Sequence, residues 1–545
     1  MTIYQHAKAI INFSRDTFWV VFIYAMSIAL LSLVVPIAAQ SLVNVVSFGT
    51  VYQPVVILTI IVFVVLTIMA GMRVAQAIVV ETIQQRLFTE IGLKLANLLP
   101  KISIANFDKH RVSELVNRFF EVQTIQKALA VLLVTGIEIC LLTLFSMLLI
   151  AFYHPLLLAF DILLIFALAL ALWLPWKKAL KYAIAECEAK HTFAAWLEEI
   201  VHNIFLFKMQ SHADYALDVA DEKIADYLIA RKKHFASILK HIFGVNIIYV
   251  LANAALLGIG GYLVIREQLS LGELVASELI VNALLYGFVR FSFYLEDLYD
   301  LLASCYKLAS LTHIPCETTQ EVVPKKYLAN SIHQLTGAPK IEVTGIKFAT
   351  EKNQQVFDDL SFAVPAGKSL AILGNKGTGK SLIVDLVLGF RQAQAGVIKV
   401  NELPIQQYNL LYLRQHAALV RRIELFSASI LENLLLQRTD ISLDMIHGLL
   451  RQFNVANTIE ALPEGLDTFI SGSQMTMSSI ELKKLMFIRA ILTQPKLFII
   501  DGALDNLPEV DLQLFLPYLK DHPSTLIITT RRQAIANYFD QHIIL

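Results

Sequence analysis

Long runs of apolar residues dominate the N-terminal half of this chain. An α-helix rises 1.5 Å per residue, so about 20 apolar residues cross the roughly 30 Å hydrocarbon core of a bilayer. Six stretches meet that length, and they lie at about residues 18–46, 54–78, 128–152, 155–176, 241–265 and 271–295. The pattern predicts an all-α transmembrane domain with six spans, over residues 1–311.

The connections between these spans alternate in length and in charge. The short connections, Ser47–Gln53 and the one around Pro155, contain no Lys or Arg, whereas the long ones, residues 79–127 and 177–240, contain many. Basic residues favour the cytoplasmic side of a membrane. The long connections and both termini are therefore expected in the cytoplasm, and the apolar periodicity of the long connections predicts helical extensions. The N-terminal residues 1–16 are interpreted as an interfacial amphipathic helix.

The pattern changes after the last span. Residues 312–339 combine prolines and charges without a sustained period, which is typical of a linker. From residue 340 to residue 545, short apolar runs such as Ser369–Leu373 and Lys496–Ile500 alternate with helical patterns. That alternation predicts an α/β domain with a mostly parallel sheet.

Composition supports a membrane protein. Hydrophobic residues make up 56% of the 545 positions and charged residues 17%, against about a quarter charged in soluble domains. The 45 basic and 45 acidic residues cancel, so no overall field favours a nucleic acid partner. The four cysteines are scattered and form no CxxC pair, which gives no sign of a disulfide framework or a cysteine metal site.

One segment of the second domain carries recognisable chemistry. It follows the apolar run Ser369–Leu373, precedes a helical pattern and matches G-x-x-x-x-G-K-[ST], the phosphate-binding loop. Its residues are Gly374, Asn375, Lys376, Gly377, Thr378, Gly379, Lys380 and Ser381. The glycines let backbone N–H groups approach phosphates, and the helix N-terminus adds its positive dipole end. The expected ligand is ATP with Mg²⁺, with Lys380 on the outer phosphates and Ser381 on the metal.

A second candidate lies further along the chain. The apolar run Lys496–Ile500 ends in Asp501, a carboxylate suited to holding Mg²⁺ through water. Many buried strands end in Asp, so this feature gains weight only beside the phosphate-binding loop. Together they assign Mg²⁺ to Ser381 and Asp501.

Six spans with long cytoplasmic extensions, a phosphate-binding loop and a strand ending at Asp501 together resemble the ATP-binding-cassette (ABC) exporters. Residues 111–126 and 462–468 look most like bacterial type I protein-secretion and peptide-export half-transporters. The resemblance implies a dimer of such halves with two ATP molecules between the cassettes. It also implies cytoplasmic docking helices, here residues 111–121, that transmit cassette closure to the spans.

The catalytic positions depart from this family. The resemblance places the glutamate that polarises the attacking water directly after Asp501, where this chain has Gly502, which offers no proton acceptor. The switch histidine falls on Arg531 or Thr530, and arginine stays protonated and cannot relay a proton. Neither catalytic position is intact.

The family's glycine-rich signature motif is also altered. Its slot holds residues 477–481, Met-Ser-Ser-Ile-Glu, of which only Ser478 matches and is expected to contact nucleotide. Side chains at Ser479 and Ile480 hinder close backbone approach to a partner's phosphate. Glu481 is expected to add a repulsive charge.

Two further nucleotide contacts are replaced. The glutamine that touches Mg²⁺ and water aligns with Arg421, followed by Arg422, and a guanidinium has no lone pair for a metal. The aromatic residue that stacks on adenine in the family aligns with Thr350. Phe348 lies on the same strand face and is the candidate substitute for that stacking. The preserved loop beside these losses predicts nucleotide binding with slow or absent hydrolysis.

Two hypotheses follow for the whole protein. The first is a membrane subunit of an ATP-dependent exporter, paired with itself or with a second half-transporter in a bacterial inner membrane. Membrane lipid and a periplasmic adaptor are its further candidate partners. The alternative is a non-transporting, nucleotide-sensing membrane protein on the same scaffold. The substrate is not readable from the sequence. The charged residues inside predicted spans, Glu138, Asp161, Glu278 and Arg290, are candidates for a substrate path or for helix pairing.

Overall fold

The structure is a computed structural model, and it describes a defined part of the chain. The described residues are 15–48, 52–104, 117–209, 212–312, 316–317, 335, 337–350, 354–471 and 477–545. Residues 1–14 of the predicted interfacial helix, residues 111–116 of the predicted docking helix and most of the linker lie outside these residues.

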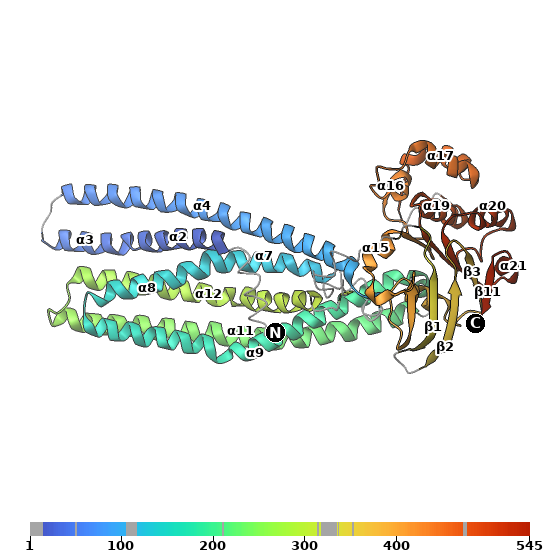
Figure 1. Cartoon of the computed structure of the whole chain (residues 1–545). Coiled ribbons are helices and arrows are strands. Elements are labelled where there is room, and N and C mark those ends of the chain that lie inside the picture. The colour runs from blue at the N-terminus through green and yellow to red at the C-terminus, as the bar shows by residue number, and fades with distance from the viewer. Residues whose placement is uncertain are drawn as a thin grey trace. The chain divides into compact units, whose positions relative to one another are not determined.

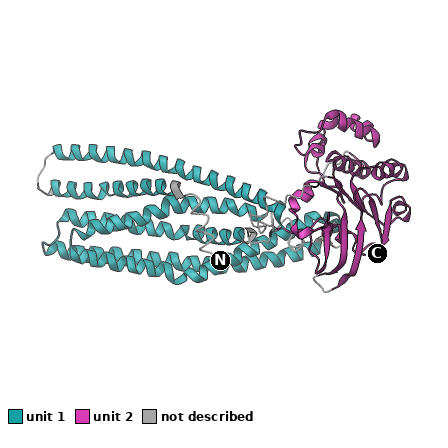
Figure 2. Cartoon of the chain, viewed as in Figure 1, with its two compact units in different colours: residues 1–102, 106–316 teal, residues 103–105, 317–545 magenta. Residues whose placement is uncertain are grey.

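The chain divides into two compact units, shown in Figure 2. The first comprises residues 1–102 and 106–316, and the second comprises residues 103–105 and 317–545. The first unit is helical and the second combines sheets with helices (Figure 1). The predicted fold class, a helical membrane domain followed by an α/β domain, is confirmed.

Long helices build the first unit. Six of its described helical stretches are long and apolar enough to cross a membrane, and they lie at Phe18–Val46, Tyr52–Lys101, Arg118–Ala151, Pro155–His202, Asp214–Ile265 and Leu271–Ala309. The helices are α2 (Arg15–Ser32), α3 (Val34–Phe48), α4 (Tyr52–Leu98), α7 (Glu121–Val131), α8 (Ile137–Ala151), α9 (Pro155–His202), α10 (Ile204–Lys208), α11 (His212–Ile265) and α12 (Leu271–Thr312). Short turns of other helix types lie at Leu99–Lys101, Arg118–Phe120 and Leu132–Gly136. Helices α9 and α11 pack along each other, as Figure 1 shows.

The first span is broken in its middle. Helix α2 ends at Ser32 and α3 begins at Val34, with Leu33 between them. Pro36 lacks an N–H group and cannot bond to the carbonyl of Ser32, and its ring clashes with that carbonyl. The break in the span therefore lies at Leu33, about one turn before Pro36.

Three sheets build the second unit. A five-stranded parallel sheet has the order β11-β3-β10-β9-β6, a four-stranded antiparallel sheet has the order β2-β1-β4-β5, and β7 pairs with β8. The strands are β1 (Ile341–Ala349), β2 (Gln355–Val364), β3 (Ser369–Leu373), β4 (Ala395–Val400), β5 (Leu403–Pro404), β6 (Ala417–Val420), β7 (Ala428–Ser429), β8 (Phe469–Ile470), β9 (Leu497–Asp501), β10 (Thr525–Thr530) and β11 (Gln541–Ile544).

Helices of the second unit pack on the sheets and on one another around two apolar clusters. They are α14 (Lys380–Val387), α15 (Leu410–Gln415), α16 (Ile430–Leu435), α17 (Leu443–Gln452), α18 (Ala456–Glu460), α19 (Ser479–Leu492), α20 (Glu509–Lys520) and α21 (Gln533–Ala536), with short turns at Ile405–Gln407 and Gly465–Asp467. In the larger cluster, Phe453 stacks on Phe515 with ring centroids 4.2 Å apart. Strand β9 is buried along its whole length, which explains its continuous apolar sequence.

Candidate nucleotide-binding site

The phosphate-binding loop connects β3 to α14. Gly377 and Gly379 have φ angles of 91° and 94°, which glycine adopts without steric cost. A Cβ atom on Gly379 would lie 2.6 Å from Phe357 Cζ, so no larger residue fits there. Within the loop, the Thr378 hydroxyl donates to the Asn375 carbonyl at 3.1 Å. The loop is thus a compact turn that ends at the N-terminus of α14.

Lys380 folds back onto this loop. Its Nζ atom donates to the carbonyl of Gly374 at 2.7 Å and to that of Asn375 at 2.6 Å. Burial, helped by the nearby Arg531 guanidinium, lowers the pKa of the Lys380 ammonium, while Asp505 and Asp501 oppose that shift. Asp501, Asp505 and Arg531 therefore lie close enough to Lys380 to act on its charge.

The register of the parallel sheet brings the predicted residues together. Leu373 of β3 pairs with Thr530 of β10, and Thr529 pairs with Asp501 of β9. Carboxyl ends of parallel strands meet at one sheet edge, where α/β proteins bind ligands. That edge consequently holds the loop that starts at Gly374, the carboxylate of Asp501 and the position after Thr530.

Arg421 follows β6 at the same edge. Val420 pairs with Ile500, so Arg421 lies level with Asp501. Its Nε atom is 2.7 Å from Asp501 Oδ2 in an ion pair. Its Nη2 atom donates to Asp385 Oδ1 at 2.8 Å and to the Ser381 carbonyl at 3.1 Å. Arg421 therefore joins β6, β9 and α14.

The structure separates the two consecutive arginines. Arg422 is 77% exposed and pairs with Glu424 at 2.9 Å, whereas Arg421 points to the site. Asp385, on the second turn of α14, is the contact that sequence reasoning missed. Its carboxylate is 7% exposed and also pairs with Arg391 at 3.1 Å. The sequence signal for this contact was an aspartate within an otherwise apolar helical run, because a buried aspartate is nearly always paired.

Gly502 begins the turn after β9. Its φ angle is 66°, its N–H donates to the Thr529 carbonyl at 3.1 Å, and a Cβ there would meet open space. Asp505, three residues on, accepts hydrogen bonds from the Thr530 hydroxyl at 2.5 Å and from the Arg531 backbone at 3.1 Å. Arg531 Nε also lies 3.2 Å from Asp505. The position expected to hold the switch histidine thus carries an ion-paired arginine.

Ser478 caps helix α19. Its hydroxyl accepts from the Glu481 N–H at 3.3 Å, and Glu481 Oε2 accepts from the Ser478 N–H at 2.7 Å. Burial acts to raise the pKa of the Glu481 carboxyl, but hydrogen bonds from Ser478 and from the Thr458 hydroxyl, the latter at 2.8 Å, lower it below its usual value. The spacing S-x-x-E is a capping-box signal that was present in the sequence. The Glu481 carboxylate therefore faces its own helix end.

Phe348 and Thr350 lie at the end of β1. Phe348 is partly buried and packs against the apolar cluster that contains Phe357, and Thr350 is exposed. Phe348 thus has a packing role within the domain.

Two family models match this chain. The ABC transporter transmembrane region matches residues 18–288, and the ABC transporter model matches residues 357–505, which include the phosphate-binding loop and Asp501. The chain is an ABC exporter. It carries both the transmembrane domain and the nucleotide-binding domain in one polypeptide, as expected from the resemblance.

Curated relatives of this ABC exporter have varied names. They include an uncharacterized ABC transporter ATP-binding protein, YknU, of Bacillus subtilis, which is 27% identical over 62% of this chain. They also include an ATP-dependent lipid A-core flippase of Saccharophagus degradans, which is 32% identical over 41% of this chain. A third is the pediocin PA-1 transport/processing protein PedD of Pediococcus acidilactici (30% over 52%). The matched segments span 57%, 39% and 39% of the lengths of these relatives.

The exporter's fold matches that of a bacterial Atm1-family ABC exporter solved with ATP bound. The TM-score is 0.84 at 19% sequence identity, and the match covers 98% of this chain and 94% of the other. At that identity the likeness establishes the fold.

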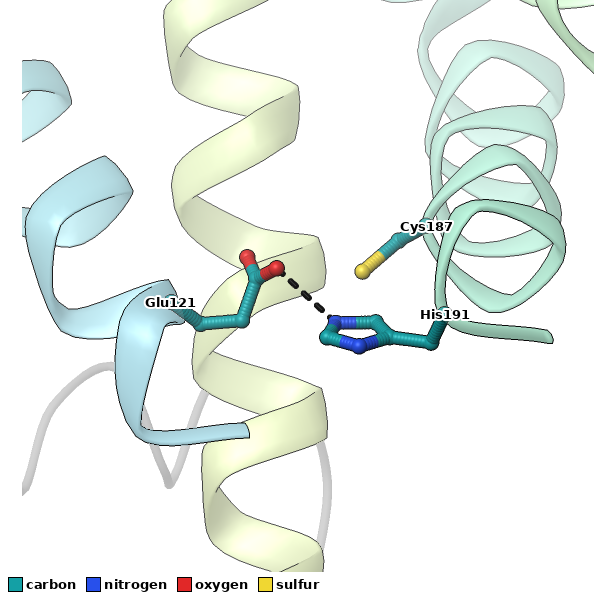
Figure 3. Close-up of side chains that lie close together, drawn as sticks. All are labelled: Glu121, Cys187 and His191. Carbon is teal, nitrogen blue, oxygen red and sulfur yellow. Dashed lines mark hydrogen bonds and ion pairs between the residues drawn. The ribbon is translucent and has the colours of Figure 1, made fainter. Parts of the chain in front are cut away.

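A second polar cluster lies in the membrane unit of the exporter. Glu121 begins α7, and Cys187 and His191 lie one turn apart on α9; Figure 3 shows the three side chains pointing toward one another. Their potential ligand atoms lie within 4.8 Å of one another, a spacing that could hold a metal ion. The Glu121 carboxylate, however, is bonded to His191 at 2.9 Å, to Lys190 at 2.8 Å and to Ser304 of α12 at 2.5 Å. The cluster is a charge-balanced joint among α7, α9 and α12.

The charged residues predicted inside spans have different surroundings. Glu138 pairs with Arg73 of α4 at 2.8 Å. This ion pair joins two helices, which was the alternative to a role in a substrate path. Asp161 is 2% exposed, and neither of its oxygens has a hydrogen-bond partner among the described residues. Arg290 is exposed and Glu278 is partly buried.

Proposed function

We propose that this chain is the membrane subunit of an ATP-dependent exporter and that its cassette binds ATP but hydrolyses it slowly or not at all. Residues 374–381 would hold the phosphates, with Lys380 released from the loop carbonyls to the outer phosphates. Ser478, at an exposed helix N-terminus, would contact a nucleotide held by a partner cassette. The partner is a second copy or another ABC half-transporter, and the membrane is the bacterial inner membrane.

The ion pairing of the two arginines carries this proposal. Hydrolysis needs a group that accepts a proton from water at this sheet edge. Gly502 has no side chain, Arg421 is paired with Asp501, and Arg531 is paired with Asp505. Asp505, a neighbouring carboxylate, already accepts hydrogen bonds from Thr530 and Arg531 at both of its oxygens. Binding groups are therefore kept while proton-accepting groups are replaced or neutralised.

ATP affinity of the chain in lipid tests the binding half of this proposal. Lys380→Ala removes the ammonium expected on the outer phosphates, and we expect at least about tenfold weaker binding, the loss typical of a charge-assisted hydrogen bond. Lys347→Ala is the control, because Lys347 is an exposed residue of β1 and pairs with Asp358. Equal affinities of the two variants would contradict the assignment of the loop as the ATP site.

A further inference from the structure

The positive charge beside Asp501 comes from a side chain of the protein, the guanidinium of Arg421. Arg421 contacts Asp501 and Asp385, whose residues are 6% and 7% exposed. Buried carboxylates need a counter-charge, and the guanidinium supplies it permanently because arginine does not deprotonate in proteins. Its contact with the Ser381 carbonyl holds it against the first turn of α14. A fixed positive charge thus stands beside the phosphate-binding loop.

The residues present do not fit a magnesium ion at this place. Mg²⁺ requires octahedral oxygen ligands at about 2.0–2.1 Å and keeps several waters. Asp501 Oδ2 lies 2.7 Å from Arg421 Nε, an ion pair without the geometry of a hydrogen bond, and Asp501 Oδ1 accepts the Thr529 hydroxyl at 2.6 Å. A guanidinium has no lone pair for a metal, and its charge repels a divalent cation. The assignment of Mg²⁺ to Ser381 and Asp501 therefore conflicts with the position of Arg421.

We propose that Arg421 takes the place of the divalent cation, so that this cassette binds nucleoside triphosphates without Mg²⁺. This inference rests on the proposed ATP binding and adds that the binding does not require a metal ion. Arginine suits the task because its planar N–H groups match phosphate oxygens in pairs. Asp385 also pairs with Arg391, so it keeps a counter-charge when Arg421 turns toward a phosphate.

The test is the ATP affinity of the full chain in phospholipid nanodiscs, measured by calorimetry with excess EDTA and with excess Mg²⁺ at matched ionic strength. For the natural sequence we expect the two dissociation constants to agree within about threefold, less than one charge-assisted contact contributes. Arg421→Gln is expected to bind at least about tenfold more weakly in EDTA and to recover in Mg²⁺, because Asp501 is then free to hold the hydrated ion.

Two further variants complete the design. Arg422→Gln is the matched control, because its exposed side chain pairs with Glu424 away from the loop, and it should behave like the natural sequence. Arg421→Lys keeps a positive charge and should retain binding in EDTA. The comparison on the natural sequence does not depend on the folding of any variant.

Each outcome decides between the two proposals. Binding by the natural sequence only in Mg²⁺, or an Arg421→Gln variant that binds equally well in EDTA, would overturn the role of Arg421 and leave ATP binding standing. Failure to bind ATP in either buffer would overturn the proposed function and this inference with it.

Discussion

Gly502 holds a left-handed backbone at the position where the resemblance to ABC exporters predicts the catalytic glutamate. Its φ of 66° follows directly after the strand residue Asp501, and its N–H is bonded to the Thr529 carbonyl. The glycine that we propose in place of the catalytic glutamate thus has a backbone conformation that residues with a Cβ rarely adopt. Arg421 and Arg531 make further ion pairs beside it. The departures from the family pattern therefore extend along the sheet edge from Gly502 to both arginines.

Gly502→Glu is therefore expected not to restore ATP turnover. A left-handed residue with a Cβ costs about 1–2 kcal/mol, so the variant should also unfold at a lower temperature. Hydrolysis rate and thermal unfolding of the chain in lipid check both effects. Gly448→Glu is the control, because Gly448 lies on exposed α17 with open space around it, and should be neutral. Turnover gained by Gly502→Glu alone would show that one missing side chain explains the slow hydrolysis.

The joint around Glu121 shows how single elements are held in the membrane unit. Lys190 and His191 reach it from α9 and Ser304 reaches it from α12, so three helices meet at one buried carboxylate. Removing one partner of a buried ion pair leaves the others without compensation. The joint should therefore contribute to the packing of these helices.

Glu121→Ala is expected to destabilise the chain by about 3 kcal/mol, because Lys190, His191 and Ser304 lose their common partner. Thermal unfolding in lipid measures this effect. Glu188→Ala, at an exposed position of α9 next to Cys187, should change the unfolding temperature little. Equal unfolding temperatures for the two variants would show that the joint contributes nothing.

Sequence patterns predicted the elements better than their contacts. Six apolar stretches and the strand, loop and helix around Gly374 followed from periodicity and spacing, because helix length and turn chemistry are local properties. The pairing of Arg421 with Asp501 depends on the register of β6 against β9, and the pairing with Asp385 depends on the placement of α14. Such contacts between distant segments are not encoded in spacing. The capping role of Glu481, by contrast, was readable from S-x-x-E.

At the scale of the whole molecule, a helical membrane unit and a nucleotide-binding unit form one ABC exporter chain. Transport that depends on ATP hydrolysis requires at least one competent site in the assembled dimer. Under the proposed function, in which its proton-accepting positions are replaced, this chain is expected to depend on a second half-transporter for turnover. A dimer of identical chains would bind nucleotide and change conformation without an efficient hydrolytic step.

The most direct measurement is the ATP hydrolysis rate of the purified chain, without a partner, in lipid and excess Mg²⁺, compared with Lys380→Ala. Our account predicts that the natural chain binds ATP in a Lys380-dependent manner while its hydrolysis rate equals that of the variant. Rapid hydrolysis by the chain alone that is lost in Lys380→Ala would contradict it and would make this chain a self-sufficient ATPase.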